Sequence, residues 1–268
     1  MRKLVLPLAL ATSAVCGTAA AQQAAAPASP ITGNMSIVSE YRFRGIDQTA
    51  GKPAIQGGVD YSHASGVYLG NWNSNVSQGA GFPGGNIEMD FYGGWKKAFG
   101  DFGLDIGAIY YFYPGTDASF LGAANPHSSQ TNSGNVHNTE FYIGGSWKFL
   151  SLKWFHALSD YFSIPDTSGT NYFDLAATYD LGSGWGVVGH VGKLKVQGYS
   201  ELDYTDYKLG VTKDITGWVL GAAFVGSNAK GNCPANATTS PYCFSNSIGQ
   251  SPRDAGRSTI VLSVGKTF

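Results

Sequence analysis

The chain has 268 residues, of which 37 are glycine and only 13% are charged, and its formal net charge is −1. A typical soluble domain has about twice this share of charged residues, so an ordinary soluble enzyme is disfavoured. The hydrophobic share of 43% argues against a disordered chain. The mean hydropathy of −0.09 argues against a bundle of membrane-spanning helices, each of which needs roughly 20 apolar residues in a row.

The N-terminal residues predict export from the cytoplasm. Arg2 and Lys3 precede an apolar stretch, and Ala19, Ala20 and Ala21 supply the small residues of a cleavage site. This order is typical of a secretory signal peptide, which we assign to residues 1–21. Residues 22–33, rich in Ala, Pro and Gln, predict a disordered lead-in, and residues 34–268 a single folded domain.

The rest of the chain shows apolar residues at every second position, in segments of about ten residues. In residues 104–112, for example, Leu104, Ile106 and Tyr110 share one face, and Asp105 lies on the other. This period is that of a strand with two different faces. The pattern predicts twelve strands, at residues 35–44, 55–62, 68–73, 87–96, 104–112, 140–148, 152–162, 173–179, 185–191, 207–211, 218–224 and 260–268.

The segment 152–162 fits the pattern poorly on either assignment of its faces. We favour Phe155, Ala157 and Tyr161 facing outward, because His156 and Asp160 then face away from lipid. Lys153 would reach the interface with its long side chain.

The connections between these segments alternate between tight turns and long polar loops. That alternation predicts an all-β fold, an up-and-down antiparallel transmembrane barrel, as in the outer membrane of Gram-negative bacteria. Tryptophans beside the short turns would form an interfacial girdle: Trp95, Trp147, Trp185 and Trp218. The terminal Phe268 resembles the signal read by the barrel-insertion machinery. The long loop at residues 114–137 could fold inward as a constriction or cover the mouth.

Two cysteines remain after the signal peptide is removed, Cys233 and Cys243, and we expect them to form a disulfide in a long loop of the exported chain. A metal site is not expected there because no histidine lies nearby in the sequence. We expect no cofactor and no nucleic-acid partner; the expected partners are outer-membrane lipid, lipopolysaccharide, the insertion machinery and small solutes.

Charged residues on the faces away from lipid are expected to line the lumen: Glu40, Arg42, Arg44, Asp60, Glu88, Asp90, Asp105, Glu140, Asp174, Asp206, Lys208 and Arg257. In one interpretation, Arg42, Arg44 and Arg257 on the first and twelfth strands oppose acidic residues on the fourth, sixth and eighth strands, which gives a transverse field at a constriction. In the other, these charges pair and fill the interior.

Three functions follow from a barrel. The first is a channel for small polar or charged solutes, and the second is a closed structural or adhesion barrel. The third and weakest is a barrel hydrolase, because the Cα atoms of His156 and Asp160, four residues apart on one strand, would lie roughly 13 Å apart. We expect no enzyme.

The segment Ser39–Asn75, with Tyr-Arg-Phe-Arg-Gly at 41–45 and Gln-Gly-Gly-Val-Asp-Tyr at 56–61, closely resembles the opening of the TorF-type porin family of proteobacteria. Shorter echoes occur at 110–115, at 158–162 and at the Lys-Thr-Phe end. The resemblance implies an outer-membrane barrel that passes small solutes. It implies no catalytic residues.

Overall fold

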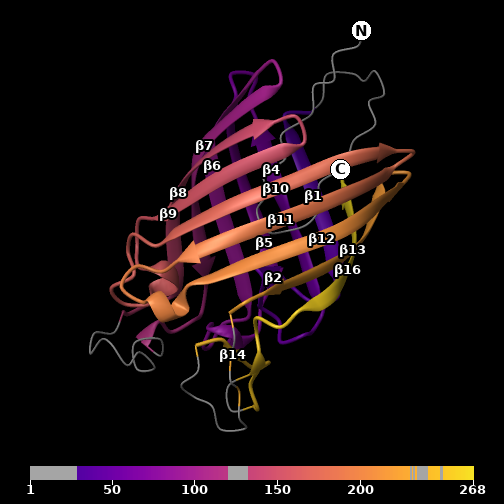
Figure 1. The fold of residues 1–268 in the computed structure, drawn as a ribbon. Helices are drawn as coiled ribbons and strands as arrows, with labels where there is room; N and C mark the ends of the chain where they lie inside the picture. The colour runs from indigo at the N-terminus through magenta and orange to yellow at the C-terminus, as the bar shows by residue number, and fades with distance from the viewer. Residues whose placement is uncertain (1–28, 120–131, 230, 232, 234–240, 248–249) are drawn as a thin grey trace.

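In a computed structural model, the strands of this chain close into a single antiparallel barrel (Figure 1). The structure describes residues 29–119, 132–229, 231, 233, 241–247 and 250–268. Within this part of the chain, the barrel contains twelve strands in the order β1-β16-β13-β12-β11-β10-β9-β8-β7-β6-β5-β4, and β1 pairs with β4 to close it. The prediction of an all-β, twelve-stranded up-and-down barrel is therefore confirmed.

The barrel strands are β1 (Ile31–Val38), β4 (Ala54–Ser62), β5 (Val67–Asn75), β6 (Ile87–Phe99), β7 (Phe102–Tyr113), β8 (Val136–Trp147), β9 (Leu150–Ala157), β10 (Asn171–Gly182), β11 (Trp185–Lys195), β12 (Tyr204–Ile215), β13 (Trp218–Ser227) and β16 (Thr259–Thr267). Two short hairpins form separate sheets that are not part of the barrel wall. They are β2 (Arg42–Phe43) with β3 (Ile46–Asp47), and β14 (Cys243–Phe244) with β15 (Arg253–Asp254). Single turns of 3-10 helix are η1 (Gln78–Ala80), η2 (Tyr161–Ser163) and η3 (Ser200–Leu202).

Tight turns join the strands at one end of the barrel, the upper end in Figure 1, and the longer connections lie at the other end. The turn between β10 and β11 shows how such a turn is made. Ser183 and Gly184 have φ angles of 53° and 77°, and two successive positive φ angles suit the twist of a tight hairpin. Residues 120–131 of the loop 114–137 lie outside the described residues, so both alternatives for this loop, an inward fold or a cover over the mouth, stay predictions.

The wall has an apolar outer face and a polar, aromatic inner face. On β6, Glu88, Asp90 and Tyr92 are buried, whereas Phe91 between them is 45% exposed. The same inversion holds on β12, where Asp206 is 1% exposed and Leu209 is 64% exposed. The core of this protein is therefore the inside of the barrel. None of the helices among the described residues is long and apolar enough to cross a membrane.

The first strand differs from its prediction at both ends. β1 begins at Ile31, inside the range 22–33 predicted as a disordered lead-in, because residues 31–38 pair with β4 along their whole length. β1 ends at Val38, so the prediction that the strand continues to residue 44 is wrong. The alternation beyond Val38 belongs to the β2–β3 hairpin, whose aromatic side chains meet other aromatic side chains inside the barrel and not lipid.

The faces of β9 are also the reverse of the favoured assignment. Phe155 and Ala157 are 6% and 1% exposed and face the interior, whereas Leu152 is 55% exposed. Lys153 does not reach toward an interface, because its Nζ donates to Asp105 Oδ2 at 2.7 Å inside the barrel. Tyr161 is buried in η2, beyond the end of β9. An internal carboxylate and an internal aromatic cluster thus decide the faces of this strand.

The four tryptophans predicted to form the interfacial girdle have two kinds of environment, and the two cysteines are bonded to each other. Trp147, Trp185 and Trp218 are 43%, 47% and 43% exposed beside tight turns, and Trp95 donates to the carbonyl of Ser65 in another tight turn at 2.9 Å. The disulfide Cys233–Cys243 is present in the connection between β13 and β16. The predicted signal peptide, residues 1–21, and residues 22–28 lie outside the described part of the chain.

A glycine on the inner face of β11 leaves room for a neighbouring ring. A Cβ at Gly192 would stand 2.0 Å from Tyr172 Oη, whereas the nearest atom to a Cβ at Gly189 on the same strand is 4.0 Å away. We expect Gly192→Ala to lower the free energy of unfolding by about 1–3 kcal/mol through overpacking.

The matched variant Gly189→Ala should leave the free energy of unfolding nearly unchanged. Urea titration of the two refolded variants, followed by tryptophan fluorescence, measures both values. Equal stabilities would contradict the packing argument.

Candidate functional site

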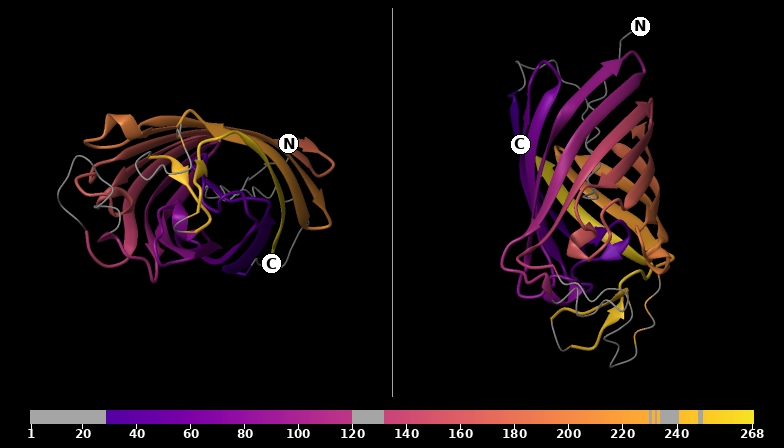
Figure 2. Two further views of the ribbon diagram at one scale, coloured as in Figure 1. Left: turned by 90° about the horizontal axis from the view of Figure 1, so that it is seen from below. Right: turned by 90° about the vertical axis from the view of Figure 1, so that its left-hand side faces the viewer.

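The segment between β1 and β4 folds into the barrel and does not extend as an outer loop (Figure 2). Every residue from Glu40 to Ala50 is buried, and we call residues 39–53 the inner hairpin. Arg44 and Gly45, with φ angles of 47° and 78°, turn the chain back on itself. A Cβ at Gly45 would meet Asp206 Cβ at 2.6 Å, so glycine allows the close approach of this turn to the wall at β12.

The inner hairpin leaves and re-enters the wall at one point. Val38, the last residue of β1, is paired with Ala54, the first residue of β4. Within the hairpin, the backbone N–H of Gln48 donates to the carbonyl of Tyr41 at 2.9 Å, and that of Tyr41 donates to Thr49 Oγ1 at 3.0 Å. The segment is therefore a self-bonded unit attached to the wall at its base.

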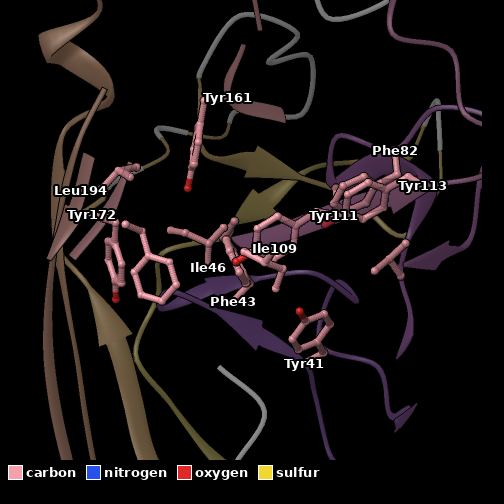
Figure 3. Packing of buried hydrophobic residues seen from close by; sticks show 14 of the residues in the cluster. Tyr41, Phe43, Ile46, Phe82, Ile109, Tyr111, Tyr113, Tyr161, Tyr172 and Leu194 are labelled. Carbon is pink, nitrogen blue, oxygen red and sulfur yellow. The ribbon is translucent and has the colours of Figure 1, made fainter. Parts of the chain in front are cut away.

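Aromatic side chains of β5, β7 and η2 pack against the hairpin (Figure 3). Phe43 contacts Tyr111 of β7 and Phe162 of η2, each with ring centroids 5.5 Å apart and edge-to-face. Tyr41 contacts Trp72 of β5 in the same manner, at 5.5 Å. Edge-to-face pairs of this kind add to the stabilisation from burial alone. The hairpin thus bridges the width of the barrel at the end opposite the tight turns.

Arg44 reaches from the hairpin into a cage on the wall. Its Nη1 and Nη2 donate to the two carboxylate oxygens of Glu140 on β8 at 2.9 and 2.6 Å, and Nη1 also donates to Tyr161 Oη at 3.1 Å. The guanidinium lies 4.1 Å from the ring centre of Tyr172 on β10 and 5.1 Å from that of Phe155 on β9. We call these four wall residues, Glu140, Phe155, Tyr161 and Tyr172, the Arg44 cage.

The cage is closed to water, since the side chains of Arg44 and Glu140 are 2% and 1% exposed. Burial, the largest single effect, lowers the pKa of Arg44, but the facing Glu140 carboxylate together with Tyr161 and Tyr111 raises it, so that the pKa lies well above its usual value. The guanidinium therefore stays charged at any physiological pH. A bidentate pair of this kind is among the stronger hydrogen-bonded interactions in proteins.

A second set of charges holds the other side of the hairpin to the connection that precedes β16. Arg257 donates to Asp47 Oδ2 at 2.7 Å and to Glu40 Oε2 at 2.8 Å. Arg42 pairs with Glu40 and donates to the carbonyls of Ala255 and Arg257, each at 2.9 Å. This connection is the one that carries the disulfide.

Two acidic residues lie beside the hairpin on β6. Glu88 and Asp90 are 0% and 2% exposed, and Tyr41 Oη donates to Glu88 Oε1 at 3.2 Å. The ion pairs of the described residues include neither of them; Glu88 Oε2 and Asp90 Oδ1 have no hydrogen-bond partner there. The interior around the hairpin is accordingly acidic on this wall.

The remaining predicted lumen acids each have a partner. Asp105 accepts from Tyr68 Oη at 2.6 Å as well as from Lys153, and Tyr68 contacts the hydroxyl of Tyr142. Asp60 accepts from Tyr92 Oη at 2.6 Å. His190 on β11 is placed between Asp174, 2.9 Å from its Nδ1, and Asp206, 2.5 Å from its Nε2.

A small cavity of about 50 Å³, partly open to solvent, lies between the hairpin and the wall of β11, β12, β13 and β16. Its polar lining includes Glu40, Arg42, Gln56, Lys208, Thr212 and Ser263. The hairpin therefore packs closely against one side of the barrel, through the Arg44 cage, and leaves space along the other.

The arrangement of the predicted lumen residues matches neither interpretation fully, neither the transverse field nor the interior filled by paired charges. Glu40, Arg42 and Arg44 lie on the inner hairpin and Arg257 in the connection before β16, so the prediction that these arginines lie on the first and twelfth strands is wrong. Arg44 meets Glu140 directly, and Arg42 and Arg257 meet Glu40. The ion pairs of the described residues include neither the acidic pair on β6 nor Asp60, which accepts from Tyr92. Whether these residues line an open path stays a prediction.

His156 and Asp160, the two residues weighed above for a barrel hydrolase, have different partners. His156 Nδ1 lies 3.0 Å from Asn171 Oδ1, whereas Asp160 Oδ1 accepts from the backbone N–H groups of Thr167 and Ser168 at 3.1 and 3.2 Å. Asp160 thus shapes the loop between β9 and β10.

The sequence analysis missed the Arg44 cage, although a weak signal was present. Tyr172 and Asp174 share the face of β10 opposite Phe173 and Leu175, which places an aromatic ring on an inner face. Nothing in the spacing of Phe155 or Tyr161 connects them to Arg44, because the contact depends on how far the hairpin reaches across the barrel.

Residues 21–268 match the family described as "Bacterial protein of unknown function (Gcw_chp)", and the chain belongs to that family. The curated proteins that were searched contain no match.

Several solved outer-membrane barrels resemble the structure. The "KdgM porin" is 8% identical with a TM-score of 0.47, over 89% of this chain and 97% of that chain. The "NanC porin" is 10% identical with a TM-score of 0.48, over 89% and 98%. "Outer-membrane expressed OmpT of Vibrio cholerae" is 9% identical with a TM-score of 0.40, over 89% and 96%. At such identities and TM-scores, these likenesses carry no argument about solutes.

The Arg44–Glu140 pair leads to a stability prediction. We expect Glu140→Ala to lower the free energy of unfolding by about 3–5 kcal/mol, because it leaves a buried guanidinium without its carboxylate. Urea titration measures the change.

The control is Lys195→Ala, which removes a pair with Asp203 in which the lysine side chain is 57% exposed. We expect a cost of about 0–1 kcal/mol there. A Glu140→Ala cost no larger than that of the control would contradict the energetic role of the cage.

Proposed function

We propose that this member of the Gcw_chp family is an outer-membrane channel of a Gram-negative bacterium. Its lumen passes small polar or charged solutes, and the inner hairpin limits the path. The observation that carries the proposal is the inversion of the wall, with charged side chains buried inside the barrel and large apolar side chains exposed outside it. In water such an apolar exterior would lead to aggregation. In a bilayer the exterior contacts hydrocarbon, where apolar side chains are favourable.

The short-turn end supports this placement. Trp147, Trp185 and Trp218 are each about half exposed there, and a lysine stands over each ring, with Nζ 4.6, 4.9 and 5.1 Å from the ring centres. Tryptophan and lysine together suit the level of lipid headgroups. We propose that this end faces the periplasm, and that Phe268, 65% exposed at the end of the last strand, takes part in recognition by the insertion machinery.

The interior supports passage of solutes more than a purely structural role. The cavity beside the hairpin is lined in part by charged and hydroxyl groups, and noncovalent contacts hold the hairpin in place. A backbone radius of roughly 12 Å for twelve strands leaves a path once inward side chains are allowed for. The closed barrel stays the second candidate, because the inner hairpin fills much of this path.

Removing the hairpin tests the channel. We expect replacement of residues 41–48 by a short Gly-Ser linker to raise single-channel conductance in a planar bilayer several-fold, since the wall is closed without the hairpin. Lys195→Ala, outside the hairpin, should conduct like the unaltered chain. If the replaced barrel inserts and stays silent, the closed-barrel function stands instead.

A charge on the outer face tests the membrane placement. We expect Leu209→Arg, at the middle of β12, to cost about 2–4 kcal/mol of folding free energy in phospholipid vesicles, and Leu181→Arg, beside a tight turn, about 0–1 kcal/mol. Both leucines are strongly exposed, at 64% and 59%, so the comparison isolates depth in the membrane. Urea titration in vesicles measures the two costs, and equal costs would contradict the proposed placement.

A further inference from the structure

We propose that the Arg44 cage is a binding site for soluble organic cations of the guanidinium class. In the closed barrel the chain's own Arg44 occupies it, and a guanidinium solute that takes this place releases the inner hairpin and widens the path. This inference rests on the proposed channel for its functional consequence, but the binding itself is a separate property.

The cage meets the three requirements of a guanidinium. Glu140 accepts two parallel hydrogen bonds, which fits a planar fork of N–H donors. Tyr172 and Phe155 supply aromatic rings at 4.1 and 5.1 Å, distances at which a cation is attracted to a ring. Tyr161 supplies a further acceptor at 3.1 Å. A small alkylguanidinium would use the same atoms.

The cage belongs to the wall and to η2, not to the hairpin. Glu140, Phe155 and Tyr172 lie on β8, β9 and β10, three consecutive strands of the barrel. The Tyr172 hydroxyl donates to Asp206 on β12 at 3.0 Å, and the Tyr111 hydroxyl on β7 donates to Glu140 at 3.3 Å. These bonds orient the cage independently of Arg44. The site is therefore expected to persist when the hairpin moves away.

The buried charge of Glu140 explains why the inner hairpin needs a solute in order to leave the cage. If the hairpin leaves alone, it exposes an interior carboxylate that is 1% exposed in the closed state and has lost its cation. A guanidinium solute supplies the missing charge and the missing donors, so it binds the open state and not the closed one. Differential binding of this kind shifts a population toward the open state.

Arg44 is singled out among the arginines of the hairpin network. Arg42 and Arg257 pair with Glu40 and Asp47, which belong to the hairpin itself. Among the cation–π contacts of the described residues, none involves Arg42 or Arg257, whereas Arg44 takes part in four. Removal of Arg257 should therefore weaken the hairpin without creating a site.

The binding test uses purified full-length chain in detergent, with methylguanidinium as the probe and titration calorimetry as the readout. We expect Arg44→Ala to bind methylguanidinium, and the double variant Arg44→Ala/Glu140→Gln to bind at least about tenfold more weakly, a difference of about 1.4 kcal/mol. Arg257→Ala, which keeps Arg44 as the competitor in the cage, should bind methylguanidinium at least about tenfold more weakly than Arg44→Ala. Equal affinities of the first two variants would overturn the inference.

The second test uses the unaltered chain in a planar bilayer, and it decides the matter if Arg44→Ala fails to fold. Millimolar methylguanidinium should raise the open fraction at least about tenfold more than methylammonium at the same ionic strength, because the fork of donors distinguishes the two. An equal response to methylguanidinium and methylammonium, or no response to either, would overturn the proposed link between guanidinium binding and opening.

The two proposals fail separately. If Arg44→Ala binds methylguanidinium while the hairpin-replaced barrel is silent, the site stands and the channel falls. If the replaced barrel conducts while Arg44→Ala does not bind, the channel stands and the site falls.

Discussion

The interior of this barrel is organised around one buried ion pair, between Arg44 at the tip of the inner hairpin and Glu140 in the wall. The two side chains are 2% and 1% exposed, and their two hydrogen bonds are 2.9 and 2.6 Å long. The desolvation of two charges offsets much of their mutual attraction, so the pair contributes less to stability than its geometry suggests. It does hold the tip of the hairpin against β8, because each of the two buried charges is the ion-pair partner of the other.

The inverted wall is what makes such a pair possible. In a soluble protein the apolar residues gather inside, and buried charges are few. Here the outer face takes the apolar residues, so the inside is free to hold carboxylates, lysine, histidine and a layer of tyrosines. Several of these tyrosines combine an apolar ring for packing with a hydroxyl that donates to an acid, as Tyr68 does to Asp105 and Tyr92 to Asp60. Many of the polar groups in the interior therefore bond to one another, whereas Glu88 Oε2 and Asp90 Oδ1 have no hydrogen-bond partner among the described residues.

The strand pattern could be predicted from the sequence because the two faces of each strand meet different surroundings. Tight-turn residues such as Ser183 and Gly184 marked the ends of the strands, and the cysteine pair followed from there being only two cysteines in the predicted exported chain. Alternation does not say what the apolar face meets. Tyr41 and Phe43 alternate with arginines as lipid-facing residues would, yet they pack on Trp72 and Tyr111 inside the barrel.

The faces of β9 could not be predicted for a related reason. Lys153 and Phe155 share one face, which looks like an interfacial lysine beside a lipid-facing ring. Both are internal because Asp105 comes from β7 and Arg44 from the hairpin, and neither partner is close in the sequence. Whether a charged residue faces inward depends on a partner brought by another strand, so the pattern of a single strand does not contain the answer.

The attachment of the inner hairpin connects stability to movement. Val38 and Ala54 are paired at its base, and every hydrogen bond of the β1–β4 ladder lies outside it. Moving the hairpin therefore breaks no bond of this ladder, although the Ser39 N–H at its start donates to the carbonyl of Leu262 on β16 at 2.8 Å. It does break side-chain contacts at the Arg44 cage, around Glu40 and Asp47, and with the connection before β16. It also breaks backbone hydrogen bonds from Asp47 N–H to the Ala255 carbonyl and from Ser77 N–H to the Gln48 carbonyl. The wall supplies a rigid frame, and these contacts set how readily the hairpin leaves; the most buried of them is the one that a soluble cation could replace.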